Sequence, residues 1–251
     1  MPSGGGVAPK TAAQRTVSIS TGHTVELPAT LRGTMFGATF AAPRRAVAEL
    51  LPDRLQPTRV TPSNKAAVTL LGAEYRAVSV PGIEPYDELA VIIPASHASG
   101  SVASSVSALT HPTDGYVWHM PVTTPHAKAF GIDVWGFPKV VADITHTDSG
   151  PVRETTVTID NERFVTLSVR QPPSVHTRTN GFSYTALEGD VFRVPNRIDA
   201  DVGGWPLSTD VSVSFGDHPK AAPLRALDLG DRALARAFLD GEVRFFQKHP
   251  V

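Results

Sequence analysis

Proline and glycine interrupt this chain at short intervals and so limit the length of any regular element. The 251 residues include 22 prolines and 20 glycines, spread among short runs rich in valine, threonine and isoleucine. Proline removes a backbone donor and glycine weakens a helix interior, so this spacing is typical of many strands joined by turns. We therefore expect a mainly β fold with few helices.

Apolar runs bounded by turn residues predict where the strands lie. The expected strands are 34–40, 66–79, 88–95, 116–122, 140–146 and 211–215. A hairpin is expected from 155–159 and 164–169, because Asp160 and Asn161 between them favour a tight turn.

The remaining segments predict short helices and loops. Residues 43–51 carry apolar residues on one helical face before Pro52, and residues 231–239 are also interpreted as a helix. The polar segments 171–183 and 193–205 contain proline or glycine and are expected to be loop-rich.

The length and composition favour one folded domain. An all-β barrel of 251 residues can form a single unit, and a hydrophobic fraction of 41% is enough for its core. We expect a single domain over 17–251 and a flexible tail over 1–16. The tail lacks the apolar stretch of a secretory signal, and no apolar run approaches the roughly 18 to 20 residues that span a bilayer, so we expect a cytoplasmic protein.

Charge and motif content exclude several classes of function. The net charge is -1 and no basic run exceeds Arg44-Arg45, so a nucleic-acid partner is not expected. There is no cysteine, which excludes thiolate chemistry, and the histidines lack the spacing of a zinc site. No glycine-rich phosphate loop or Gly-x-Ser-x-Gly is present either. We expect neither a metal nor a cofactor.

The segment 130–139 carries the strongest indication of chemistry. It places Lys139 after Trp135, Gly136, Phe137 and Pro138 in an apolar stretch. An ordinary lysine, with a pKa near 10.4, is a free amine in only about one molecule in 2,500 at pH 7, and burial favours that amine. Lysines more often cover apolar surface while their charge reaches water. Spacing alone leaves both interpretations open.

Residues 131–139, Gly-Ile-Asp-Val-Trp-Gly-Phe-Pro-Lys, resemble a motif of the acetoacetate decarboxylase family. The family motif is Gly-Arg-Glu-x-x-Gly-(Tyr/Phe)-Pro-Lys-Lys, and its first lysine, which forms a Schiff base, matches Lys139. The segments 50–55, 85–88, 116–120 and 215–219 are also similar to the family, so the resemblance covers roughly 30–245. It implies an antiparallel β-barrel or cone with peripheral short helices, an interior lysine and a homo-oligomer.

The resemblance also suggests partners for the lysine. Glu88 matches the family glutamate in Tyr-x-Glu, and Arg32 is the best candidate for the arginine that meets a substrate carboxylate. Glu74 matches a second glutamate, and Phe137 takes the aromatic position two before the lysine. Independently of the family, His119 on an alternating strand is a candidate acid or base, although a structural histidine is the commoner outcome.

Two departures from the family motif affect the expected chemistry. Val140 stands where the family has its second lysine, so only burial is left to activate Lys139 at this position. Ile132 and Asp133 replace the arginine and glutamate of Gly-Arg-Glu, so the polar network near the lysine must differ.

The sequence therefore predicts a lyase that acts on a small keto acid through an imine on Lys139. Loss of carbon dioxide from a β-keto acid is the first expectation. An aldolase or dehydratase acting on pyruvate-like keto acids is the second. A non-catalytic barrel that binds a small apolar ligand is the third.

Overall fold

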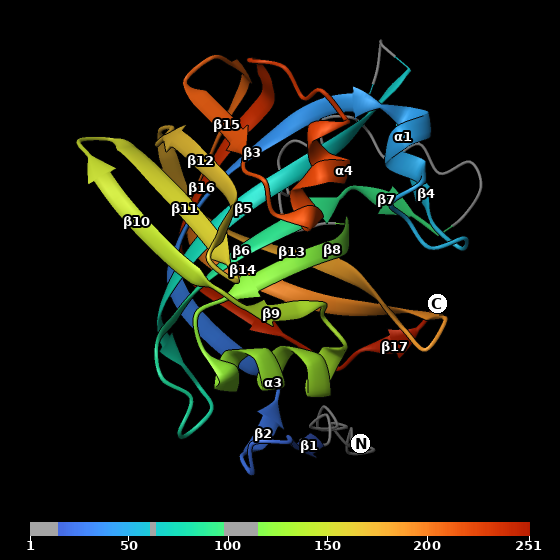
Figure 1. The fold of residues 1–251 in the computed structure, drawn as a ribbon. Helices are drawn as coiled ribbons and strands as arrows, with labels where there is room; N and C mark the ends of the chain where they lie inside the picture. Colours follow the sequence, from blue (N-terminus) through green and yellow to red (C-terminus); the bar gives the residue numbers. More distant parts are fainter. Residues whose placement is uncertain (1–14, 61–63, 98–114) are drawn as a thin grey trace, which may run out of the picture.

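One large sheet curls into a barrel (Figure 1). The structure, a computed structural model, describes residues 15–60, 64–97 and 115–251. The nine-stranded sheet has the order β13-β14-β16-β3-β5-β6-β8-β9, with β17 beside β14. A short parallel pairing of β13 with β8 closes the ring. Its strands are β3 (Ala29–Pro43), β5 (Lys65–Val78), β6 (Tyr86–Ile93), β8 (Gly115–Val122), β9 (Lys139–Val141), β13 (Ser174–Leu187), β14 (Asp190–Ser208), β16 (Ala233–Phe245) and β17 (His249–Pro250).

A second sheet of four strands packs on the outside of the barrel. Its members are β10 (Asp143–Ser149), β11 (Val152–Ile159), β12 (Glu162–Arg170) and β15 (Val211–Phe215). The strands of the barrel that face this outer sheet contribute side chains to two cores, because side chains alternate along a strand. In β6, Tyr86, Ala90 and Ile92 belong to the core inside the barrel, whereas Leu89 and Val91 belong to the core between the sheets. This double burial explains the continuous apolar run of β6.

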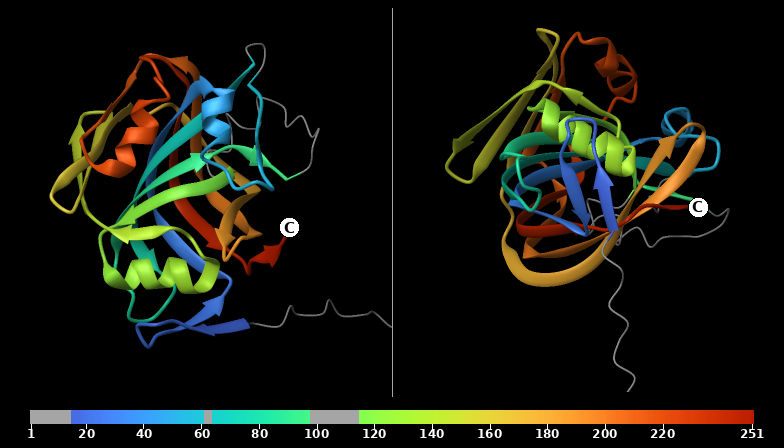
Figure 2. Two further views of the ribbon diagram at one scale, coloured as in Figure 1. Left: turned by 45° about the vertical axis from the view of Figure 1, so that its right-hand side comes forward. Right: turned by 90° about the horizontal axis from the view of Figure 1, so that it is seen from below.

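Short elements cover the ends of the barrel. Helix α3 (Pro125–Trp135) and the hairpin of β1 (Arg15–Ser18) and β2 (Thr24–Leu27) lie over one end (Figure 2). The remaining elements are α1 (Arg44–Ala48), β4 (Gln56–Pro57), β7 (Ala95–Ser96), the 3-10 turn η1 (Pro219–Ala221) and α4 (Ala222–Arg225). Among the described residues, no helix is long and apolar enough to cross a membrane.

The mainly β class and the barrel with short peripheral helices are confirmed. The predicted hairpin is present as β11 and β12, and Asp160 and Asn161 have the positive φ of 51° and 64° that its turn requires. Of the expected tail, residues 1–14 lie outside the described residues, while Arg15 and Thr16 belong to β1.

Three local predictions were wrong. The expected loops at 171–183 and 193–205 are largely the long paired strands β13 and β14, whose outer faces are polar because they meet solvent. The expected helix at 231–239 falls mostly in β16, whose small residues fit the repeat of a helix as well as the repeat of a strand. Helix α3 was not predicted, although Thr124 caps its first turn and Gly136, at φ 78°, ends it.

Candidate active site

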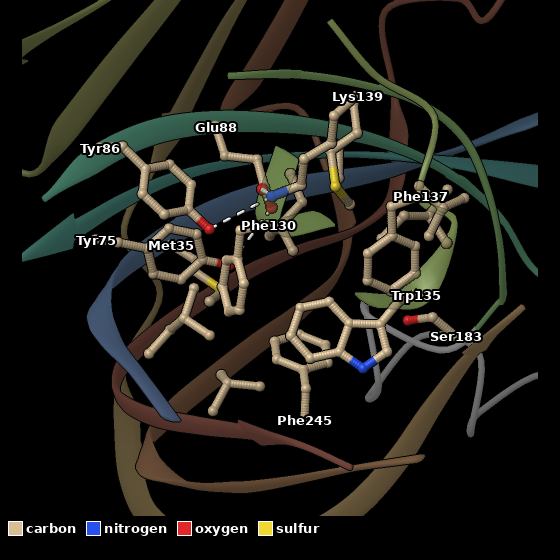
Figure 3. A pocket seen from close by; sticks show the side chains of 17 residues that line it. Met35, Tyr75, Tyr86, Glu88, Phe130, Trp135, Phe137, Lys139, Ser183 and Phe245 are labelled. Carbon is tan, nitrogen blue, oxygen red and sulfur yellow. Dashed lines mark hydrogen bonds and ion pairs between the residues drawn. The ribbon is translucent and has the colours of Figure 1, made fainter. Parts of the chain in front are cut away.

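A cavity inside the barrel holds the predicted lysine (Figure 3). Its free volume is about 40 Å³, whereas one water needs about 10–15 Å³, so it admits a molecule of a few heavy atoms. Most of its lining is apolar. The lining residues are Leu31, Met35, Leu71, Tyr75, Tyr86, Glu88, Ala90, Ile92, Val117, Met120, Phe130, Trp135, Phe137, Lys139, Ser183, Val243 and Phe245.

The end of α3 and the start of β9 place Lys139 in this cavity. The left-handed Gly136 turns the chain back, so the Phe137 amide donates to the carbonyl of Gly131 at 3.1 Å. Pro138 prevents the helix from continuing, and β9 then pairs with β8 so that Lys139 lies beside Met120. The residue is only 5% exposed, so its amine is removed from bulk water.

Glu88 is the charged partner of the lysine. Its Oε2 lies 2.7 Å from Lys139 Nζ, and both side chains are almost fully buried. Each charge compensates the other, which is the condition under which a protein interior tolerates an ion pair. A proton passed from Nζ to the carboxylate leaves a free amine and a carboxylic acid side by side. The arrangement therefore contains a nucleophile and an acid within hydrogen-bond reach of each other.

Two tyrosines that were not predicted complete the polar group. The Tyr75 hydroxyl donates to Glu88 Oε1, and Lys139 Nζ donates to the Tyr86 hydroxyl, both at 3.4 Å. Burial raises the pKa of both phenols well above the usual value, and the charge of Glu88 raises it further. Both therefore remain protonated near neutral pH. One signal for them was present in the sequence, because side chains alternate along a strand and Tyr86, two residues before Glu88 on β6, therefore faces the same side as Glu88. Tyr75 pairs with Tyr86 across the β5–β6 ladder.

Aromatic rings form the wall opposite these polar groups. Phe137, a candidate for contact with substrate, lines the cavity, and its ring centroid lies 5.8 Å from that of Trp135. The Trp135 ring also contacts Phe130 and Phe245, and its indole nitrogen donates to the carbonyl of Phe246 at 2.8 Å. This bonded indole fixes the wall in place.

Arg32 and Glu74 do not reach the cavity, which corrects the expectation that they contact substrate. Leu31 and Met35 of β3 face inward, whereas Arg32, next to an irregularity in the β3–β5 ladder, points out to solvent. Glu74 precedes the inward Tyr75 on β5 and so faces the outer sheet, where its carboxylate accepts from Arg153 at 2.8 Å.

His119 also lies outside the cavity. An irregularity opposite Val91 and Ile92 adds one residue to β8, and the His119 ring packs against Phe164 in the outer core. Burial lowers its pKa to about 4, assisted by the charges of Lys220 and His218. The side chain is thus a neutral part of the core between the sheets, and the proposed role as an acid or base facing the pocket lacks the required geometry.

The departures from the family motif also lie away from the cavity. Val140 packs on the outer core, because side chains alternate and Lys139 faces inward. Asp133 accepts a hydrogen bond from the Ser20 amide at 2.6 Å and so joins α3 to the N-terminal hairpin. Neither position changes the groups that surround Nζ. Within the described ranges, no group of three or more His, Asp or Glu side chains is placed to hold a metal.

Comparisons with known proteins agree with this architecture. The family model described as acetoacetate decarboxylase matches residues 15–248. The sequence has no significant match among curated proteins.

Several solved structures share the fold. An acetoacetate decarboxylase from Legionella pneumophila has a TM-score of 0.64 at 13% identity, over 89% of this chain and 87% of that one. An acetoacetate decarboxylase-like enzyme from Sphingomonas wittichii RW1 has a TM-score of 0.63 at 14% identity, over 90% and 94%. The enduracididine biosynthesis enzyme MppR, complexed with the condensation product of pyruvate and imidazole 4-carboxaldehyde, has a TM-score of 0.65 at 14% identity, over 96% and 98%. At such identities the likeness establishes the fold alone.

Proposed function

The chain belongs to the acetoacetate decarboxylase family, and from this premise we propose that it is a lyase that decarboxylates a small β-keto acid through an imine on Lys139. One observation carries the proposal. The only lysine that lines the cavity, among the described residues, is buried there at 2.7 Å from a carboxylate in an otherwise apolar surround.

The first stage of the proposed reaction forms the imine. Glu88 takes a proton from the Lys139 ammonium, and the freed amine attacks the keto carbon. The oxygen then leaves as water, and the product is a protonated imine bonded to Nζ. The apolar lining and the burial of Lys139 support this stage because they limit competing water at the amine.

Carbon dioxide is lost in the second stage. The bond to the carboxylate breaks, its electron pair forms the enamine double bond, and the imine π pair returns to nitrogen. A water, directly or by way of Glu88, then gives a proton to the enamine carbon. The hydroxide that this leaves adds to the imine carbon, and cleavage of the carbon–nitrogen bond releases the ketone and the amine of Lys139. No arginine lines the cavity among the described residues, so the substrate carboxylate is not over-stabilised in its ground state.

An aldolase or dehydratase is the second candidate. It shares the imine, and it is supported by the fold shared with MppR, whose structure contains a pyruvate condensation product. Product analysis separates the two. Release of carbon dioxide from a β-keto acid supports the first, and condensation of pyruvate with an aldehyde supports the second. The buried Lys139–Glu88 pair argues against a purely ligand-binding barrel, because a passive apolar site has no need of it.

Borohydride trapping tests the imine directly. The protein is mixed with candidate keto acids, reduced with borohydride and mapped by mass spectrometry. A reduced adduct on the peptide that contains Lys139, lost in Lys139→Ala, is the expected result. Absence of any adduct with every carbonyl compound tried would remove the proposal and favour the ligand-binding barrel. Assembly into a homo-oligomer and a cytoplasmic location remain predictions.

A further inference from the structure

Tyr75 and Tyr86 enter the cavity together from neighbouring strands. They are direct partners in the β5–β6 ladder, each is 4% exposed, and their ring centroids lie 5.0 Å apart. Their raised pKa values keep both hydroxyl protons in place. The cavity thus presents two hydroxyls fixed by sheet geometry rather than by a loop.

The two hydroxyls are used differently. The Tyr75 hydroxyl donates its hydrogen to Glu88 Oε1, and the other oxygen of that carboxylate, Oε2, faces Lys139. That of Tyr86 instead accepts from Nζ, so its own hydrogen points elsewhere. Within the part of the chain that the structure describes, no acceptor for that hydrogen is found. Because Tyr86 accepts the bond from Nζ with a lone pair of its oxygen, its hydrogen can turn toward a ligand oxygen.

Resting on the imine mechanism above, we propose that Tyr86 is a catalytic residue that donates a hydrogen bond to the keto oxygen attacked by Lys139. Figure 3 shows the Tyr86 hydroxyl pointing toward Nζ, and an oxygen one bond from the carbon joined to Nζ would come close to this hydroxyl. Tyr75 is a positioning residue that holds the Glu88 carboxylate toward the amine.

The proton balance assigns each group one task. The Lys139 ammonium gives a proton to Glu88, the amine forms the N–C bond, and the oxygen takes the proton from Glu88. The nitrogen then returns a proton to Glu88, which protonates the hydroxyl, and the C–O bond breaks to release water and the protonated imine. Tyr86 keeps its own proton throughout. It stabilises the oxygen while negative charge develops on it, as donors of an oxyanion hole do.

Two matched variants test the assignment, because Tyr86→Phe and Tyr75→Phe each delete one hydroxyl and keep the ring. The rate of imine formation is followed by borohydride quenching at successive times, and by exchange of ¹⁸O from water into the product ketone. Tyr86→Phe is expected to slow both by about a hundredfold. Tyr75→Phe is expected to slow them by less than about tenfold, since Glu88 keeps its contact with Nζ at 2.7 Å and loses only the hydrogen bond that orients it.

The outcomes separate this assignment from the imine itself. A wild-type adduct on Lys139 together with an unchanged rate in Tyr86→Phe overturns the role of Tyr86 and leaves the imine mechanism standing. No wild-type adduct with any keto acid overturns both. Should Tyr86→Phe fail to fold, 3-fluorotyrosine can replace the 4 tyrosines of the wild type, since Tyr116 and Tyr184 do not line the cavity. This stronger donor is expected to speed imine formation, and an unchanged rate counts against the assignment.

Discussion

The stem of Lys139 crosses Gly131 so closely that a β-carbon at residue 131 would lie 2.4 Å from both Cδ and Cε of the lysine. Helix α3 therefore does more than close the end of the barrel. Because Gly131 has no side chain, the stem of the lysine has room to pass the helix and reach Glu88. The conformation of Lys139 therefore depends on a residue eight positions earlier in the chain.

Gly131→Ala should therefore impair imine formation without unfolding the protein. The added carbon displaces a flexible side chain rather than backbone, and alanine favours a helix interior by up to about 1 kcal/mol over glycine. We expect adduct formation to slow by at least about tenfold, because a misplacement near 1 Å costs that much or more. Gly204→Ala is the matched control, since its new carbon meets nothing within 4 Å. Equal trapping rates in the two variants would contradict the role of Gly131.

The buried pair should show strong coupling in stability. Lys139→Met or Glu88→Leu alone leaves one buried ionisable group without its partner, which costs about 3–5 kcal/mol. The double variant replaces the pair with apolar side chains and should cost clearly less than the sum of the two. Urea unfolding of the four proteins measures the coupling. Additivity within about 0.5 kcal/mol would mean that the two side chains do not interact energetically.

The sequence allowed the buried lysine and its carboxylate partner to be predicted but not the groups around them. Lys139 and Glu88 lie in continuous motifs, so their proximity followed from the family resemblance. Tyr75 was missed because it joins the site only through its pairing with Tyr86 on β6, and Tyr86 was missed although it is the tyrosine of the Tyr-x-Glu motif.

Arg32 was misplaced because it was assigned by resemblance and not from the alternation of β3, which turns Leu31 and Met35 inward and Arg32 outward. His119 was misplaced because an extra residue in β8 changes the face of the strand without a clear trace in the sequence.

Longer-range pairing also explains the errors in the fold. Strands β13 and β14 are polar on the outside, where ion pairs such as Arg178–Asp199 at 2.8 Å link them. The residues that pair in these segments are far apart in the sequence, up to Ser174 with Gly203, so local propensity alone assigned them to loops. Both strands nevertheless belong to one hairpin, which turns at Glu188 and Gly189. The hairpin at Asp160 and Asn161 was predicted because its strands are short and apolar residues alternate directly beside the turn.

Arg32→Ala should leave the reaction unchanged. The side chain is exposed on the outer face of β3 and does not line the cavity. We expect kcat/KM with a β-keto acid within about twofold of wild type, as is usual for surface substitutions. A large rise in KM confined to carboxylate substrates would instead place Arg32 in the site.

Stability should fall in mild acid because of His119. Its folded pKa of about 4 lies below the ordinary value near 6.5, so the unfolded chain binds a proton first as the pH falls. The stability that its neutral form contributes is complete above pH 6.5 and is lost as the pH falls to about 4, a change of up to about 3 kcal/mol.

Urea unfolding at several pH values measures this contribution. His119→Phe retains a ring against Phe164 but cannot titrate, so its stability should depend less on pH over this range. His249→Phe at an exposed histidine is the control and should behave as wild type. Parallel pH dependence in all three proteins would exclude His119 as the cause.

The lining of the cavity predicts different rates for two β-keto acids that differ only in whether the end remote from the leaving carboxylate carries a second carboxylate. Among the described residues, Lys139 is the only cation that lines it, and Glu88 already pairs with that charge. A substrate that keeps a carboxylate after losing carbon dioxide would therefore bury a charge without a partner.

3-Oxopentanoate and 3-oxopentanedioate form the matched pair, because only the second retains a carboxylate in its product. An unpaired buried charge costs several kcal/mol, so we expect kcat/KM for the dianion to be lower by at least about a hundredfold. Carbon dioxide release is measured for both, and the rate with Lys139→Ala is subtracted to remove spontaneous loss. Similar values for the two acids would show that the dianion meets a cation in the site, and the apolar character of the cavity would then not govern its choice of substrate.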